Sequence, residues 1–133
     1  MSISPAELAK SDTEHAHQRA FFCALQPHLH THPQLRWMHA IPNGGSRDAA
    51  TAGRLKAEGV RAGVWDAFLP VAKDNWHGLY LEFKKPSRRS ERNGGLSPVQ
   101  HEFGLFVHSQ GYKTAVVYTW QEALKDTLNY LKE

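Results

Sequence analysis

Helix-like and strand-like segments alternate along this chain, and their order limits the fold more than any other feature of the sequence. Hydrophobic spacing, capping residues and turn signals predict the order helix, strand, helix, strand, strand, helix, strand, helix. Helices placed between strands are typical of an α/β fold, in which they cover a central sheet. We therefore expect a mixed central sheet flanked by helices, with an extra helix between the first and second strands.

Capping and helix-ending residues set the bounds of the expected helices. A serine followed by proline is typical of a helix start, and a glycine is typical of a helix end. The expected helices cover residues 4–26, with an internal start at 11–14, and residues 46–59, 97–111 and 120–132. The expected strands cover residues 35–41, 66–72, 78–84 and 113–119. Turns or loops are expected at 28–33, 42–45, 73–75 and 85–95.

The composition is that of a soluble single-domain protein. The 133 residues are 41% hydrophobic and 22% charged, with a formal net charge of +3, which suits one apolar core and permits a polyanion partner. The longest apolar runs fall far short of the ~20 residues that span a membrane. A single cysteine, Cys23, excludes internal disulfides and Cys-based zinc sites. We expect one domain over residues 1–133, cytoplasmic (in the host cytoplasm if a phage encodes it), without membrane contact.

The chemistry concentrates in the expected strand at 78–84. Its apolar face comprises Leu79, Leu81 and Phe83. Glu82 and Lys84 share the other face, where a carboxylate can hold a divalent cation and an amine can orient a water at the same phosphate. If this strand pairs with the preceding one, Asp66 and Glu82 converge on one cation. The alternative is that Glu82 and Lys84 form a solvent-facing charge pattern.

These residues resemble a known family of nucleases. Asp66 followed by Glu82-Phe83-Lys84 resembles the core motif of the PD-(D/E)xK nuclease superfamily. More narrowly, the resemblance is to the VRR-NUC family and covers the chain from about Glu14 to Tyr118. It is carried by Ile41-Pro42-Asn43-Gly44-Gly45, Arg54-Leu55-Lys56, Gly59, Gly63-Val64-Trp65-Asp66, Glu82-Phe83-Lys84-Lys85-Pro86 and Leu96-Ser97-Pro98-Val99-Gln100. The family usually has proline directly before the metal-binding aspartate, whereas this chain has Trp65.

The resemblance implies a metal-dependent, structure-specific endodeoxyribonuclease on an αβββαβ core. It implies that Asp66, Glu82 and the backbone carbonyl of Phe83 bind Mg²⁺ or Mn²⁺. Lys84 would position the water that attacks the phosphodiester. The metal would stabilise the negative charge that develops during in-line displacement.

Two further residues would complete the catalytic set, and each has a structural alternative. Glu14 would ligate a second metal or a metal-bound water, but it also lies three residues after Ser11 and could complete a capping box. Gln100 would orient Lys84 or a phosphate, but it has the same spacing from Ser97. The sequence leaves both alternatives open.

Basic residues follow the motif where a DNA backbone would pass. A charged loop is also often simply solvated, so both interpretations stand. The candidate phosphate contacts in this loop are Lys85, Arg88, Arg89 and Arg92, and a second group that could extend them comprises Arg47, Arg54, Lys56 and Arg61.

Several functions remain open. The resemblance favours a homodimeric Holliday-junction resolvase acting on branched DNA, because symmetric cleavage of a four-way junction needs two active sites. A flap or nicking endonuclease and a catalytically silent nucleic-acid-binding module are the alternatives on the same fold. A histidine-rich metal-binding protein is a third class, since His28, His30 and His32 would share a face if they formed a strand. Their flanking prolines instead favour a loop.

Overall fold

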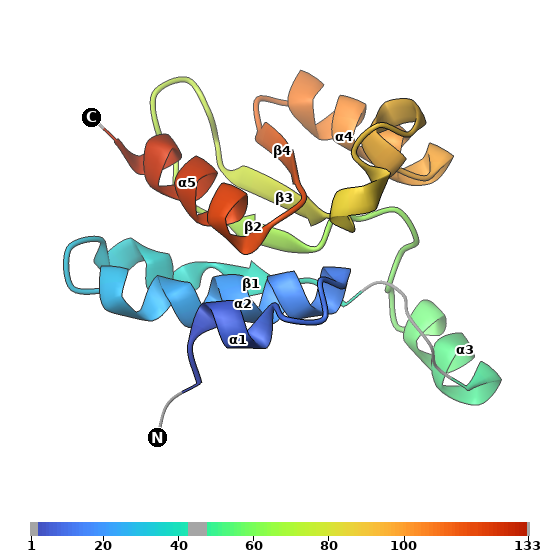
Figure 1. The fold of residues 1–133 in the computed structure, drawn as a ribbon. Coiled ribbons are helices and arrows are strands. Elements are labelled where there is room, and N and C mark those ends of the chain that lie inside the picture. The colour runs from blue at the N-terminus through green and yellow to red at the C-terminus, as the bar shows by residue number, and fades with distance from the viewer. Residues whose placement is uncertain (1–2, 43–47, 133) are drawn as a thin grey trace.

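The computed structural model describes residues 3–42 and 48–132, which contain a four-stranded mixed sheet (Figure 1). Its strands are β1 (His39–Ala40), β2 (Ala67–Leu69), β3 (Leu79–Phe83) and β4 (Lys113–Val117), in the order β1-β2-β3-β4. Neighbours β1–β2 and β2–β3 are antiparallel, whereas β3–β4 is parallel. The expected mixed sheet flanked by helices is therefore confirmed.

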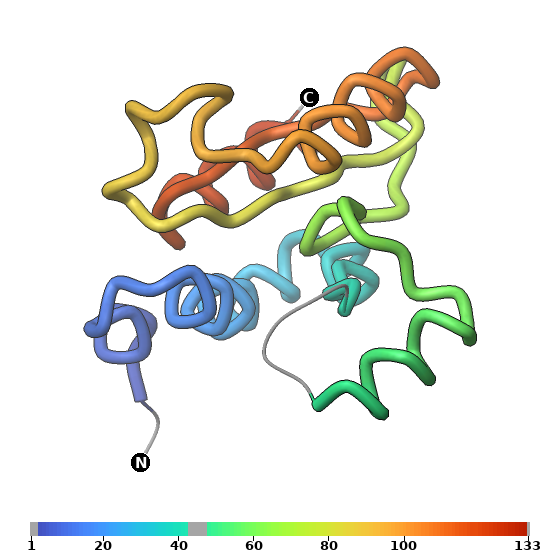
Figure 2. The backbone as a smooth tube through the Cα atoms, turned by 90° about the vertical axis from the view of Figure 1, so that its right-hand side faces the viewer, coloured from blue at the N-terminus to red at the C-terminus, as the bar shows by residue number. Residues whose placement is uncertain are grey.

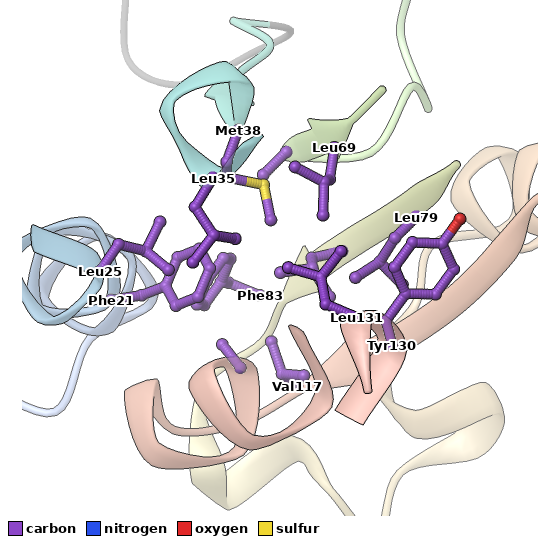
Figure 3. Close-up of a cluster of buried hydrophobic side chains, with 13 residues drawn as sticks. Phe21, Leu25, Leu35, Met38, Leu69, Leu79, Phe83, Val117, Tyr130 and Leu131 are labelled. Carbon is purple, nitrogen blue, oxygen red and sulfur yellow. The ribbon is translucent and has the colours of Figure 1, made fainter. Parts of the chain in front are cut away.

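The described helices are α1 (Pro5–Leu8), α2 (Glu14–Leu25), α3 (Ala49–Ala57), α4 (Pro98–Ser109) and α5 (Trp120–Leu131). Helices α2 and α5 pack against each other and against β3, and Figure 3 shows Phe21 of α2 and Leu131 of α5 in one core with Phe83. Helix α4 covers the other face, where the rings of Phe103 and Tyr80 meet edge to face. Helix α3 stands apart from the sheet and has no buried residue (Figures 1 and 2).

The internal helix start expected at 11–14 is real. The first helix ends at Leu8, and the turn that follows it places Asp12 at a φ of 61°. Thr13 then caps α2 by accepting a hydrogen bond from the N–H of Ala16. The buried His17 ties this turn to α5, because its Nε2 lies 2.5 Å from the Asp12 carboxylate and its Nδ1 accepts from the N–H of Trp120.

The expected strand at 35–41 is wrong over most of its length. Residues Pro33–Trp37 form a 3₁₀ helix, and only His39–Ala40 pairs with β2. Leu35 and Met38 are both buried in the core, and a spacing of three residues places them on one side of a 3₁₀ turn rather than of a strand. Strand β2 is also shorter than expected, because Pro70 has no N–H to continue the pairing.

The helix expected at 46–59 begins later than predicted. Its cap is Asp48, whose carboxylate accepts from the N–H of Thr51 at 2.8 Å. Ser46 and most of the turn expected at 42–45 lie outside the described residues. Gly59 follows the helix with a φ of 105°, as expected of a terminating glycine. Within residues 3–42 and 48–132, no helix has the length and apolar character needed to cross a membrane.

Candidate active site

The β2–β3 hairpin brings the two predicted metal-binding carboxylates together. Asp66 directly precedes β2, and Ala67 pairs with Leu81, so Asp66 lies beside Glu82. The N–H of Asp66 donates to Glu82 Oε1 at 3.2 Å, and the N–H of Phe83 donates to Asp66 Oδ2 at 2.9 Å. The backbone therefore holds both carboxylates in fixed orientations at one end of the hairpin.

Glu82 and Lys84 are buried, so the solvent-facing alternative is wrong. They are 2% and 6% exposed, and Lys84 Nζ lies 3.6 Å from Glu82 Oε2. Burial raises the pKa of Glu82 to about 8, and the negative charge of Asp66 adds to the rise while the Lys84 ammonium opposes it. Burial also raises the pKa of Asp66. Negative charge on this pair is therefore unfavourable, and a bound cation would stabilise it.

Gln100 completes the capping box and also contacts the site, but through Glu82 rather than through Lys84 or a phosphate. Its Oε1 accepts from the N–H of Ser97 at 2.9 Å, which completes the capping box at the start of α4. Its Nε2 donates to Glu82 Oε2 at 2.8 Å. One amide therefore fixes the helix start and orients a buried carboxylate.

Glu14 borders the same site. It is the first residue of α2, whose cap is Thr13, so the proposed capping box with Ser11 is absent. The charge of Glu14 raises the pKa values of both Asp66 and Glu82. A cavity of about 660 Å³ opens between these groups, and its lining comprises Glu14, His15, Gln18, Ala40, Ile41, Pro42, Ala62, Gly63, Asp66, Glu82, Lys84, Ser97, Val99 and Gln100.

Trp65 joins the approach to β2 to helix α4. Its indole N–H donates to the backbone carbonyl of Gln100 at 2.8 Å, and the side chain is buried. The ring lies so close to Gly104 that an added Cβ would come within 2.5 Å of it. This contact could not be predicted from the sequence, because it joins residues that are far apart in the chain.

The basic residues divide into those with and without acidic partners. Arg88 pairs with Glu91 at 2.9 Å, and Arg89 pairs with Glu122 while its guanidinium lies 4.4 Å from the centre of the Tyr118 ring. The other candidates are exposed, and among the described residues none of them makes an ion pair. They are Lys85, Arg92, Arg54, Lys56 and Arg61. Arg47 lies outside the described residues.

The donor groups suit a hard cation. Asp66 and Glu82 offer carboxylate oxygens, and the Phe83 carbonyl faces the same side of β3 as the N–H that binds Asp66. Mg²⁺ is commonly held by one or two carboxylates with waters and substrate phosphate completing its shell. Across residues 3–42 and 48–132, no three His, Cys, Asp or Glu side chains are grouped to hold a metal. This holds for His28, His30 and His32, and it also leaves Glu14 outside the group formed by Asp66 and Glu82.

Comparison with known proteins supports the fold. No family model matches the chain, and no curated protein matches it. A solved structure described as a VRR_NUC domain protein is similar, with 23% sequence identity and a TM-score of 0.56 over 74% of this chain and 69% of that chain. The chain therefore has the fold of a VRR_NUC domain protein.

Proposed function

We propose that this protein is a VRR-NUC-type, metal-dependent endodeoxyribonuclease. The observation that carries the proposal is the hydrogen-bonded pair of Asp66 and Glu82, with Lys84 and Gln100 both directed at Glu82 Oε2. These groups line one cavity. A fold shared with a VRR_NUC domain protein supports the same assignment.

Each residue has a defined task in phosphodiester hydrolysis. Asp66, Glu82 and the Phe83 carbonyl would hold Mg²⁺ or Mn²⁺, which would stabilise the negative charge that develops on the phosphate. Lys84 holds the attacking water in line, so that its oxygen bonds to phosphorus as the opposite bridging P–O bond breaks. Gln100 keeps Glu82 in place. We assign Glu14 to a second metal or a metal-bound water.

We propose branched DNA as the substrate and a homodimer as the active form, working in the cytoplasm. A four-way junction carries two symmetric cleavage positions, and a two-fold dimer supplies two active sites. The candidate contacts to the DNA backbone are Lys85, Arg88, Arg89, Arg92, Arg54, Lys56 and Arg61. A monomer in analytical ultracentrifugation, both alone and on DNA, would overturn the resolvase assignment.

The test is cleavage of a labelled four-way junction beside a matched linear duplex, with Mg²⁺, Mn²⁺ or EDTA. We expect paired, metal-dependent incisions in the junction. Lys84→Ala should slow them about 100-fold or more, whereas Lys132→Ala, at an exposed lysine after α5, should not.

Other outcomes separate the alternatives. Metal-dependent cutting of flaps or nicking of duplex would retain the nuclease chemistry and overturn the resolvase assignment. Tight junction binding without cleavage in either metal would identify a silent nucleic-acid-binding module.

A further inference from the structure

A second cavity continues from the active site along helix α2. It has a volume of about 380 Å³ and is lined by Leu8, His15, Gln18, Arg19 and Phe22. His15 and Gln18 also line the catalytic cavity, so the two hollows adjoin. Pockets of roughly 300–1,000 Å³ are typical of small-ligand sites.

The lining residues form one face of α2. His15, Gln18, Arg19 and Phe22 have the spacing of neighbours on a helix, and Leu8 of α1 faces them. Phe22 and Leu8 are half-buried and supply an apolar wall, while Arg19 is exposed. Within residues 3–42 and 48–132, neither the Gln18 amide nor the Arg19 guanidinium has a hydrogen-bonding or ion-pairing side-chain partner.

We infer that this cavity binds an unpaired nucleotide of the DNA strand whose phosphate enters the catalytic site. The inference rests on the proposed nuclease function and adds a reason for the site to prefer DNA with an unpaired nucleotide, such as one opened at a branch point, over intact duplex. An aromatic wall with a nearby arginine is the combination that holds single-stranded nucleic acid, by stacking and by phosphate contact. Gln18 can both donate to and accept from a base edge. A base inside a duplex is stacked between its neighbours and offers no face to Phe22.

The test measures binding of branched DNA that carries the fluorescent base 2-aminopurine at the branch point. The base is placed either in an unpaired nucleotide or in a matched duplex. Binding is measured with Mg²⁺ in a Lys84→Ala background, in which cleavage should be slow, and gel analysis after each titration verifies that the strand is uncut. We expect a fluorescence change and tighter binding for the unpaired base. Phe22→Leu should weaken that binding about ten-fold and leave duplex binding unchanged.

Controls separate stacking from general effects. Phe106→Leu alters another aromatic, 61% exposed, that lines neither cavity, and should change nothing. Gln18→Ala provides a second variant, because Phe22 also contacts Phe21, and it should weaken binding of the unpaired base alone. Arg19→Gln should weaken binding of the DNA with the unpaired base. Lys125→Gln, which changes an exposed lysine on α5, should not.

The outcomes distinguish this inference from the proposed function. Equal binding of paired and unpaired bases, or indifference to both Phe22→Leu and Gln18→Ala, would overturn the nucleotide site even if junction cleavage is normal. A change in oligomeric state without a change in DNA binding would identify a protein interface instead and would also overturn it. Selective binding of the unpaired base in a chain that never cleaves DNA would retain this site and overturn the nuclease.

Discussion

A negative charge on Glu82 is unfavourable as long as no cation is bound. It is 2% exposed and lies beside the carboxylate of Asp66. Its pKa rises from an ordinary value of 4.5 to about 8. Protonation, a cation or replacement of the carboxylate can each remove that charge, and each has a different measurable effect.

We predict that the metal-free protein loses stability as pH rises. Between about 4.5 and about 8, the folded state retains a proton on Glu82 that the unfolded state has released, so the free energy of unfolding falls over that range. Urea unfolding in EDTA at several pH values measures this fall. In the Glu82→Gln variant most of this fall in the free energy of unfolding should disappear. Adding Mg²⁺ at pH 8 should restore stability to the unmodified chain but not to the variant. Equal slopes for both chains would contradict the assignment.

Helix capping and the contact to Glu82 can be tested with two variants. Ser97→Ala removes the hydroxyl that accepts from the Gln100 N–H, so it should lower the free energy of unfolding by about 1 kcal/mol and leave metal affinity unchanged. Gln100→Ala instead removes the side-chain amide, and with it both the acceptor for the Ser97 N–H and the donor to Glu82. It should weaken Mg²⁺ binding about 10- to 100-fold, as loss of a group that supports a metal ligand usually does. Titration calorimetry separates the two variants, and equal metal affinities would contradict the role given to Gln100.

At the scale of elements, two helical glycines should respond to alanine in opposite ways. Gly104 of α4 abuts the Trp65 ring, whereas Gly53 of α3 has no atom within 4 Å of an added Cβ. Gly104→Ala should lower the free energy of unfolding by about 1–3 kcal/mol and slow cleavage, because α4 carries Gln100. Gly53→Ala should slow amide exchange within α3 without lowering global stability. Urea unfolding and hydrogen exchange measure both effects.

Local pattern was enough to predict some elements and not others. The alternation of Leu79, Leu81 and Phe83 gave the buried face of β3, and Ser97-Pro98 gave the start of α4. The strand expected at 35–41 was wrong, because burial of Leu35 and Met38 in the shared core decides that segment. At the candidate site, too, contacts between neighbouring segments could be predicted and contacts between distant segments could not.

Asp66, Glu82 and Lys84 could be predicted because they belong to one hairpin, whose pairing follows from neighbouring segments. The contacts of Trp65 and the double use of Gln100 could not, because they depend on how α4 packs across the sheet. His15 lay next to Glu14 in the sequence, yet only the packed helix shows that it lines the cavity.

At the scale of the whole molecule, the ion pairs rank the basic residues as candidate contacts to the proposed DNA substrate. Lys85 is exposed and, within the described part of the chain, makes no ion pair, whereas Arg89 already pairs with Glu122. We predict that Lys85→Gln lowers the salt dependence of DNA binding by about one counterion, while Arg89→Gln lowers it less and reduces stability. Binding titrations across a range of NaCl concentrations measure both slopes. A larger loss of slope for Arg89→Gln would contradict this ranking.

The sheet joins a local antiparallel hairpin, β2–β3, to a parallel pair, β3–β4, that closes only after α4 has crossed over. Contacts between distant segments form late in folding, because the intervening loop must first be closed. We therefore expect the candidate active site to assemble in two stages, with the acidic pair formed early and Gln100 added at the end. Pulse-labelled hydrogen exchange should protect β2 and β3 before α4. A nascent chain emerging from the ribosome would then carry paired carboxylates before the rest of the site is in place.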